Sequence, residues 1–259
     1  MELIATPTAK RIAKFITDTV RNANAKGIVV GLSGGIDSAV AATLAVRGIG
    51  PVDVEALIMP HSSGDPAAVL RAREMATFLG IRSEVVSIDT MTDAGLEATG
   101  AERDKVRRGN VMARARMILL YDRARSTGRL VLGTGNRTEL LTGYSTLHGD
   151  AACDLAPLIH CYKREVRALA RELGLPASVI EAAPSAGLWP GQTDEDELGI
   201  RYELLDRLLV LVVEEELSDE EVRDQTGCSQ AEVSRARGLY ERSAYKRRGM
   251  ISGPVPSRA

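Results

Sequence analysis

Apolar residues in the first half of the chain gather in short runs that are separated by longer helical stretches. Bulky and β-branched residues, such as those at 28–30, are typical of a strand buried in a parallel sheet. Alternating strands and helices predict an α/β fold, a doubly wound parallel sheet with helices on both faces. The predicted strands are Gly27–Leu32, Val54–Met59, Ser83–Ile88 and Leu130–Gly133.

The pattern changes after the fourth predicted strand. Two stretches, 143–150 and 184–192, are too polar and too rich in turn residues for the interior of a helix or strand. Irregular segments of this length on an α/β scaffold often act as substrate loops or covers. The rest is helical and shows no repeat or linker. We therefore expect a single domain over residues 1–259, with a helical C-terminal part and a flexible tail at 252–259.

Composition narrows the class of protein. Aromatic residues make up only 3% of the 259 residues, so the core must be largely aliphatic. A net charge of −2 argues against a protein that mainly coats nucleic acid or an anionic membrane. Without an apolar run of membrane length or a signal peptide, we expect a cytoplasmic protein. Cys153, Cys161 and Cys228 lack CxxC spacing, which favours reduced thiols over disulfides or a zinc site.

The most informative stretch joins the first predicted strand to an apolar helix. A phosphate bound there would meet the N-terminus of the helix, where unpaired N–H groups and the helix dipole favour an anion. Asp37 is unusual, because its carboxylate would repel phosphate oxygens unless a divalent cation lay between them, so the loop predicts Mg²⁺. The stretch consists of Gly31, Leu32, Ser33, Gly34, Gly35, Ile36, Asp37 and Ser38.

This loop is neither GxxxxGK[ST] nor GxGxxG. It resembles the signature of the PP-loop ATP pyrophosphatases, which split ATP between the α and β phosphates. The alternative from the residues alone is a glycine turn in which Ser38 is an ordinary helix N-cap.

Four later segments make the resemblance more specific. Together with the loop, and in this order along the chain, they are similar to segments of the ammonia-dependent NAD⁺ synthetases. The resemblance covers the chain from Lys10 to about Arg248. The loop is GLSGGIDSA (31–39), and the four later segments are GNVMARARM (109–117), LGTGNRTELLTGY (132–144), GDAACDLAPL (149–158) and PSAGLWPGQTDEDELG (184–199).

The resemblance implies an adenine nucleotide alpha hydrolase-like fold, a homodimer and a ligase that uses ATP as co-substrate. The carboxylate of nicotinic acid adenine dinucleotide (deamido-NAD⁺) would attack the ATP α-phosphate, with pyrophosphate leaving. Ammonia would then attack the acyl adenylate, giving NAD⁺ and AMP. The interface of a homodimer would include the Arg-rich helix predicted at 104–126, through Val111, Ile118 and Leu119.

The resemblance also implies roles for particular residues. Asp37 and Lys163 would take part in catalysis, and Asp37 with Glu139 would hold Mg²⁺. Without the resemblance, Glu139 is most simply a carboxylate at a helix N-terminus, Lys163 a surface lysine and Asp154 an N-cap or turn residue. The ATP site would consist of residues 31–38 with Thr134, Lys163 and Ser185, and the deamido-NAD⁺ site of Arg114, Asp154, Tyr245 and Lys246.

Two positions depart from the family pattern, both on the side of the acid substrate. Leu147 stands where the family usually has Lys, and Tyr245 stands where it has His. The glutamine-dependent relatives carry a nitrilase-like N-terminal domain, whereas only about thirty residues precede the loop here. We therefore expect no glutaminase domain, and ammonia that comes free from solution or from a separate donor protein.

Three alternatives stay open. The first is a PP-loop ligase that acts on a different carboxylic acid. The second is a PP-loop enzyme that modifies tRNA, although this chain shows no basic or zinc-bearing extension for RNA. The third is DNA binding by a helix-turn-helix at 217–237, which is also consistent with an ordinary pair of packed helices.

An acyl adenylate hydrolyses if water reaches it, so the enzyme should cover it before ammonia arrives. The two stretches with glycines at possible hinges, Asp89–Gly109 and Pro184–Gly199, are the predicted covers.

Overall fold

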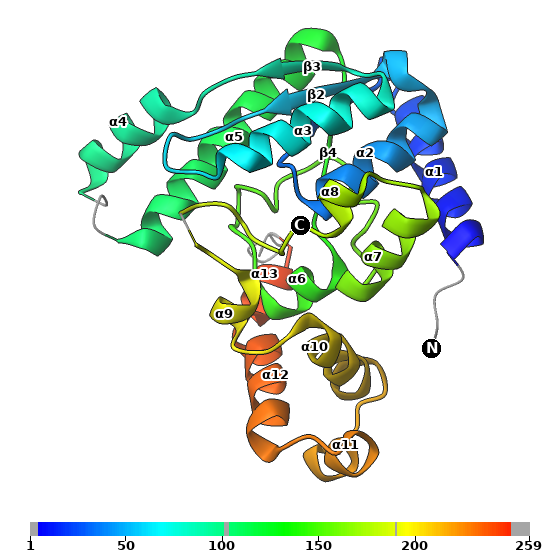
Figure 1. Ribbon diagram of the computed structural model, residues 1–259, viewed down its shortest axis with the longest axis vertical. Helices are drawn as coiled ribbons and strands as arrows, with labels where there is room; N and C mark the ends of the chain where they lie inside the picture. Colours follow the sequence, from blue (N-terminus) through cyan, green and yellow to red (C-terminus); the bar gives the residue numbers. More distant parts are fainter. Residues whose placement is uncertain (1–4, 101–103, 190, 250–259) are drawn as a thin grey trace, which may run out of the picture.

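The computed structural model describes residues 5–100, 104–189 and 191–249, and it confirms the α/β class (Figure 1). The predicted tail at 252–259 lies outside the described residues. The strands are β1 (Ile28–Gly31), β2 (Val54–Ile58), β3 (Arg82–Val85) and β4 (Leu130–Leu132).

Helices connect and follow the strands. Up to β4 they are α1 (Ala5–Asn22), α2 (Ile36–Ile49), the 3₁₀ turn η1 (Pro51–Asp53), α3 (Pro66–Leu79), α4 (Asp89–Thr99) and α5 (Lys105–Thr127). After β4 they are α6 (Arg137–Thr142), α7 (Lys163–Glu172), α8 (Ala177–Ile180), α9 (Asp194–Leu198), α10 (Tyr202–Leu209), the π-helical turn η2 (Val210–Glu214), α11 (Asp219–Thr226), α12 (Gln230–Arg242) and α13 (Ala244–Arg247).

The four strands form one parallel sheet in the order β3-β2-β1-β4. Ile28 lies opposite Val54 on one side and Leu130 on the other. The chain runs outward from β1 to β3 and then returns to β4 on the far side of β1, so the strand order reverses between β1 and β4. Open α/β sheets bind ligands at the carboxyl ends of the strands beside such a reversal.

Alternate residues of the strands enter two separate cores. Ile28 and Val30 of β1 pack with residues of α1, α2, α3 and α7, whereas Val29 packs with residues of α5. This pattern follows from the period of two in a strand, which sends successive side chains to opposite faces. The prediction of helices on both faces and of a largely aliphatic core is confirmed.

The two edges of the sheet are protected in different ways. Every residue of β3 is exposed, and its charged Arg82 and Glu84 disfavour pairing with another chain. The predicted third strand extended three residues too far, because Ile88 is already the N-cap of α4. At the other edge, Gly133 N–H donates to Leu155 O at 2.8 Å, so an irregular segment covers β4.

The Arg-rich helix predicted at 104–126 is α5, which begins one residue later. Asp104 is its N-cap, and the carboxylate accepts hydrogen bonds from Val106 N and Arg107 N at 3.0 and 3.1 Å. A side chain that accepts from these unpaired N–H groups fixes the start of the helix.

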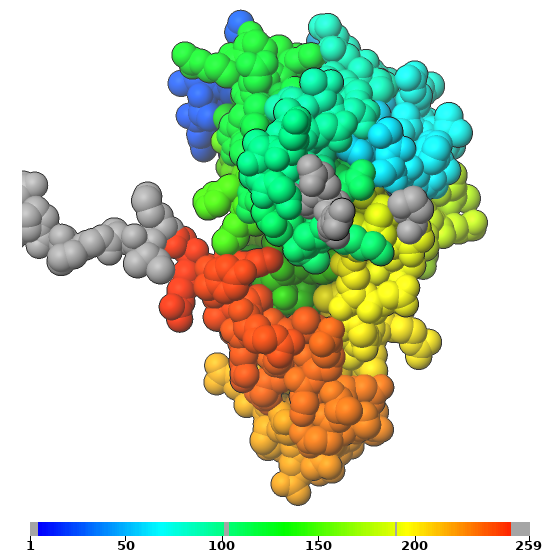
Figure 2. Space-filling model, turned by 90° about the vertical axis from the view of Figure 1, so that its left-hand side faces the viewer, coloured from blue at the N-terminus to red at the C-terminus, as the bar shows by residue number. Residues whose placement is uncertain are grey.

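Helices α10–α12 form the end of the molecule farthest from the sheet (Figures 1 and 2). Their core, which includes Leu205, Val222 and Val233, also takes in Leu141 of α6 and Tyr162 beside α7. Arg235 donates to Leu198 O at 2.7 Å, and Arg237 donates to Asp219 at 2.7 Å. Because both arginines serve contacts within the protein, α11 and α12 fit a packed helix pair better than a DNA-reading motif.

All three cysteines are free, as predicted. Among the helices of the described chain, none combines the length and the apolar character needed to cross a membrane.

The packing of the larger core can be tested at Leu44, which is fully buried on α2. We expect Leu44→Ala to lower the free energy of unfolding by about 2–5 kcal/mol, because the deleted atoms leave a cavity. Leu70→Ala on α3 is the matched control, since Leu70 is 68% exposed, and should change stability by about 0.5 kcal/mol or less. Urea denaturation measures both, and equal losses would contradict the assignment of Leu44 to the core.

Candidate active site

The glycine-rich loop is held in a compact turn at the end of β1. Gly34 has a left-handed φ of +79°, and a Cβ added there would lie only 2.1 Å from the backbone oxygen of Ala68. Ser38 Oγ donates to Gly35 O at 3.0 Å and accepts from Ser33 N at 3.2 Å. The alternative in which Ser38 is an N-cap is wrong, because α2 begins at Ile36 and its N-cap is Gly35.

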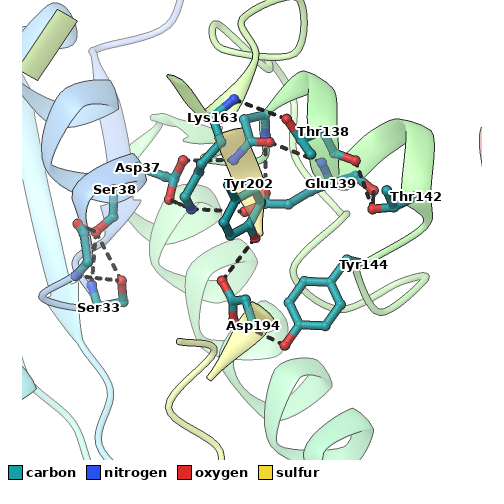
Figure 3. A network of polar contacts seen from close by, with 12 residues as sticks. Ser33, Asp37, Ser38, Thr138, Glu139, Thr142, Tyr144, Lys163, Asp194 and Tyr202 are labelled. Atoms are coloured by element: carbon teal, nitrogen blue, oxygen red, sulfur yellow. Dashed lines mark hydrogen bonds and ion pairs between the residues drawn. The ribbon is translucent and has the colours of Figure 1, made fainter. Parts of the chain in front are cut away.

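Asp37, in the first turn of α2, joins the helix after β1 to the two helices that follow β4 (Figure 3). Its Oδ1 accepts from Asn136 Nδ2 at 2.8 Å, and its Oδ2 lies 2.5 Å from Lys163 Nζ. The carboxylate therefore sits at the reversal of strand order, where the sheet topology places a ligand site.

Glu139 serves both roles that its position suggests. Its backbone N–H donates to Asn136 Oδ1 at 3.0 Å, and its Oε2 accepts from Asn136 N at 3.1 Å, forming a capping box at the start of α6. Its Oε1 lies 3.5 Å from Lys163 Nζ. The helix-terminal carboxylate and the candidate metal ligand are thus the same side chain, facing Asp37 across one ammonium group.

Lys163 is not a surface lysine, because its side chain is only 3% exposed. It is the first residue of α7, and its N–H donates to Thr138 Oγ1 at 3.0 Å. Buried Asp206 accepts from that same hydroxyl at 2.5 Å and from Arg164 N at 2.8 Å. These contacts fix the start of α7 on α6 and aim the lysine at the two carboxylates.

The cluster is strongly coupled in charge. Burial and the neighbouring Asp37 carboxylate raise the pKa of Glu139 to about 8. Burial works against the charge of Lys163, but Asp37 and Glu139 outweigh it and raise the pKa of the lysine. The lysine therefore stays protonated and compensates Asp37, and it also compensates Glu139 where that acid is ionised.

The donors suit a hard divalent cation. Asp37 and Glu139 come from different helices and converge on one cation, Lys163. In the described part of the chain, no group of three or more His, Cys, Asp or Glu side chains forms a metal cage. Two carboxylates completed by phosphate oxygens and water are the ligand set that Mg²⁺ commonly uses. The residues present therefore fit Mg²⁺ carried in with a phosphate ligand.

The two remaining positions predicted for ATP lie on different segments. Thr134 is half-buried on the loop from β4 to α6, two residues before Asn136. Ser185 is exposed near the start of the irregular segment, and its Oγ accepts from Gly187 N at 3.0 Å.

The positions predicted for the acid substrate divide into two sets. Exposed Arg114 donates to Leu147 O at 3.3 Å, and Lys246 Nζ donates to Gly143 O at 2.6 Å, so both cations flank the segment 143–147. Tyr245 beside them is exposed. Asp154 instead lies along β4, where its carboxylate accepts from the N–H of Val131 at 2.7 Å, a contact with a strand and not the helix cap or turn that the residues alone suggested.

Four residues of this site were missed from the sequence: Asn136, Tyr144, Asp194 and Tyr202. Asn136 carried a readable signal, since Asn followed three residues later by Glu is a capping-box pattern. Tyr144 and Asp194 lie in the family-like segments 132–144 and 184–199, and Tyr202 lies outside them. The contacts among these three residues could not be predicted, because they form only after the chain has folded.

A family model described as NAD synthase matches residues 8–250. The NH(3)-dependent NAD(+) synthetase of Thermococcus kodakarensis is 45% identical over 237 residues, which are 92% of this chain and 92% of the relative.

Two solved structures are also similar. The NMN synthetase from Francisella tularensis has a TM-score of 0.87 at 35% identity, covering 98% of this chain and 100% of that one. The NH3-dependent NAD synthetase from Campylobacter jejuni has a TM-score of 0.79 at 29% identity, with the same coverage of 98% and 100%.

Gly34 provides a test of the loop. We expect Gly34→Ala to weaken nucleotide binding and to destabilise the fold more than Gly80→Ala does. Both residues have positive φ, but no atom lies within 4 Å of a Cβ added at Gly80, so the control isolates the backbone strain. Calorimetric titration with ATP and urea denaturation measure the two effects, and equal losses in the two variants would show that the contact with Ala68 is unimportant.

Glu139 provides a test of the charge cluster. The pKa of its carboxyl is about 8 in the folded protein against 4.5 for an ordinary glutamate, so between these values the folded state holds a proton that the unfolded state has lost. The contribution of Glu139 to the free energy of unfolding therefore falls as the pH rises from about 4.5 to about 8.

We expect Glu139→Gln to gain stability relative to the unchanged protein as the pH is raised from 5 to about 8, measured by urea denaturation. Exposed Glu97→Gln is the control and should show no such trend. A constant difference for Glu139→Gln over the whole window would contradict the raised pKa.

Proposed function

The chain belongs to the NAD synthase family, and on that premise we propose that this site converts deamido-NAD⁺ to NAD⁺. Ammonia supplies the amide nitrogen, and ATP is split to AMP and pyrophosphate. The observation that carries this proposal is the convergence of Asp37, Glu139 and buried Lys163 beside the glycine-rich loop, where the strand order reverses.

The loop supports binding of the ATP phosphates. Its N–H groups belong to the turn that starts α2, and the N-terminus of that buried helix favours an anion. Gly34 and Gly35 let the backbone approach a phosphate without a Cβ in between. Ser33 and Ser38 hold the turn through their own hydrogen bonds.

Asp37 and Glu139 would hold Mg²⁺, which when bound would neutralise charge on the phosphate oxygens. In the protein without ligands, Lys163 compensates both carboxylates. We expect the lysine to turn toward the phosphates once another cation lies at the carboxylates.

Lys163 suits the charge that develops as pyrophosphate leaves the α-phosphate. Its ammonium group is already desolvated and oriented, and one well-aimed donor of this kind is typically worth about 3 kcal/mol in an enzyme. Arg114 and Lys246, on either side of the segment 143–147, are the cations that would receive the anionic dinucleotide.

The two predicted covers touch each other, which supports their role in excluding water. Leu188 of the irregular segment packs on Gly109 of α5, so closely that an added Cβ would lie 2.7 Å from its Cδ1. Figure 2 shows the irregular segment in yellow beside the green surface of α4 and α5. Covers that meet in this way would shield an acyl adenylate from water until ammonia enters.

NMN is a second candidate product. The structure of a protein named NMN synthetase has the higher TM-score of the two similar structures. Leu147 and Tyr245 both depart from the family pattern at the acid substrate. The corresponding acid would be nicotinate mononucleotide. The 45% identity to an NAD⁺-forming relative favours deamido-NAD⁺.

A homodimer and a separate ammonia donor stay predictions. Ile118 on α5 is half exposed, and Val111 packs on α4 near Gly95, so only part of the predicted apolar face is open to a partner.

The function is tested by an assay with ATP, Mg²⁺ and ammonium, in which deamido-NAD⁺ and nicotinate mononucleotide are offered separately. We expect NAD⁺ and AMP to appear in equal amounts with deamido-NAD⁺, and much more slowly with the mononucleotide. Chromatography of the products measures both. Turnover of the mononucleotide alone would reject the proposed acid, and no AMP with either acid would reject the chemistry.

Asp37→Asn should lower this turnover by roughly 100-fold or more, because the variant loses one carboxylate at the metal and at Lys163. Asp53→Asn, at an exposed aspartate near the opposite end of the sheet, is the matched control.

A further inference from the structure

Asp194 is a carboxylate in an unusual environment. It is the first residue of the short helix α9, whose other acidic residues are partly or fully exposed, yet Asp194 is only 4% exposed. Its Oδ2 accepts from the hydroxyl of Tyr202 at 3.0 Å, and its Oδ1 accepts from the hydroxyl of Tyr144 at 3.1 Å. A buried carboxylate needs such donors, because an unpaired one would be strongly destabilising.

Tyr202 connects this carboxylate to the reaction centre. Its side chain is fully buried, and the Lys163 ammonium lies 5.1 Å from the centre of its ring. An ammonium over the face of an aromatic ring is attracted to it, so the ring helps to position the lysine. The hydrogen bond to Asp194 holds the far end of the ring and thereby fixes its direction under Lys163 (Figure 3).

Tyr144 connects the carboxylate to α6. Its backbone N–H donates to Glu139 O at 3.0 Å, just past the end of that helix. Its single hydroxyl proton is shared between Asp194 and Glu197, whose Oε2 lies at 2.7 Å. Burial and Asp194 raise the pKa of both Tyr144 and Tyr202, so both hydroxyls stay protonated and continue to donate.

The same group of contacts reaches the irregular segment. The backbone N–H of Asp194 donates to Pro184 O at 3.1 Å. Gln192 Nε2 donates to Glu197 Oε1 at 3.0 Å, and Gln192 Oε1 accepts from Leu188 N at 2.8 Å. Both ends of the segment are therefore fastened next to Asp194, and Leu188 between them packs on α5.

We infer that Asp194 is a positioning residue, which orients Lys163 through the Tyr202 ring. By holding the start of α9 on Tyr144 and Tyr202, it also fastens the cover formed by residues 184–189 and 191–199 to the reaction centre. The inference rests on the proposed function for its effect on turnover. The fastening of the cover does not depend on which acid is the substrate.

The test uses Asp194→Asn, which keeps the size of the side chain but replaces one acceptor oxygen by an NH₂ group. We expect kcat to fall about 10- to 100-fold, because a small displacement of a group that acts in the transition state has an effect of this size. The KM values for ATP and for the acid should change less than about threefold, because the loop at 31–38, Arg114 and Lys246 are untouched and Lys163 is proposed to act mainly on charge that develops in the transition state.

Tyr202→Phe tests the same link without altering Asp194. It keeps the ring under Lys163 and deletes only the hydroxyl, so it reports on the contact even if Asp194→Asn does not fold. If Asp194 acts through Tyr202, the double variant should lose little more kcat than either single variant. Asp196→Asn, on the exposed side of the same helix, is the control and should keep its kcat within twofold.

Hydrogen exchange measured by mass spectrometry on the free proteins gives a reading that does not need activity. Peptides from 184–199 should exchange faster in Asp194→Asn than in Asp196→Asn or the unchanged protein. Unchanged exchange in Asp194→Asn would overturn the fastening of the cover. The positioning of Lys163 would be overturned if kcat of Asp194→Asn were unchanged, if only its KM values rose, or if the losses in kcat of the two single variants added fully in the double variant. An unchanged protein without activity would instead reject the proposed function, while the exchange data would still decide whether Asp194 holds the cover.

Discussion

The buried ammonium of Lys163 between the carboxylates of Asp37 and Glu139 is the interaction on which the arrangement of this site depends. It joins α2, the helix that follows β1 along the chain, to α6 and α7, which follow β4. Removing one partner would leave an uncompensated buried charge, which typically destabilises a protein by about 3–5 kcal/mol. The cluster therefore fixes the distance between the two strands at the reversal of strand order, and that distance sets the shape of the ligand site.

The same cluster makes the site responsive to its ligand. In the free protein Lys163 compensates Asp37, and Glu139, whose pKa is about 8, adds a negative charge only above that pH, where it would repel a bare nucleotide at close range. A nucleotide that arrives with a divalent cation removes this difficulty, because the cation can go to the carboxylates and the lysine to the phosphates. Binding of nucleotide and metal should thus be mutually dependent, with the aromatic ring of Tyr202 supporting the lysine from the other side.

Much of the candidate site could be predicted from local sequence. The loop at 31–38 has residue types that few other motifs combine, and the pairing of Asp37 with Glu139 followed from the family resemblance. Burial of Lys163 could not be predicted, because a lysine that begins a polar helix looks exposed until α6 and α10 pack over it. The N-cap of α2 could not be chosen from the sequence either, because a serine or a glycine can precede a helix, and only the fold selects Gly35 over the alternative Ser38.

The central claim is that Lys163 leaves the two carboxylates for the phosphates of a bound nucleotide, while a divalent cation replaces the lysine at Asp37 and Glu139. A crystal structure with Mg²⁺ and an ATP analogue whose α–β bridging oxygen is replaced by methylene tests it most directly. The account predicts phosphates on the N–H groups of 33–38, Mg²⁺ at the carboxylates of Asp37 and Glu139, and Lys163 Nζ within hydrogen-bonding distance of a phosphate oxygen. Phosphates bound elsewhere, with Lys163 still paired to Asp37, would contradict it.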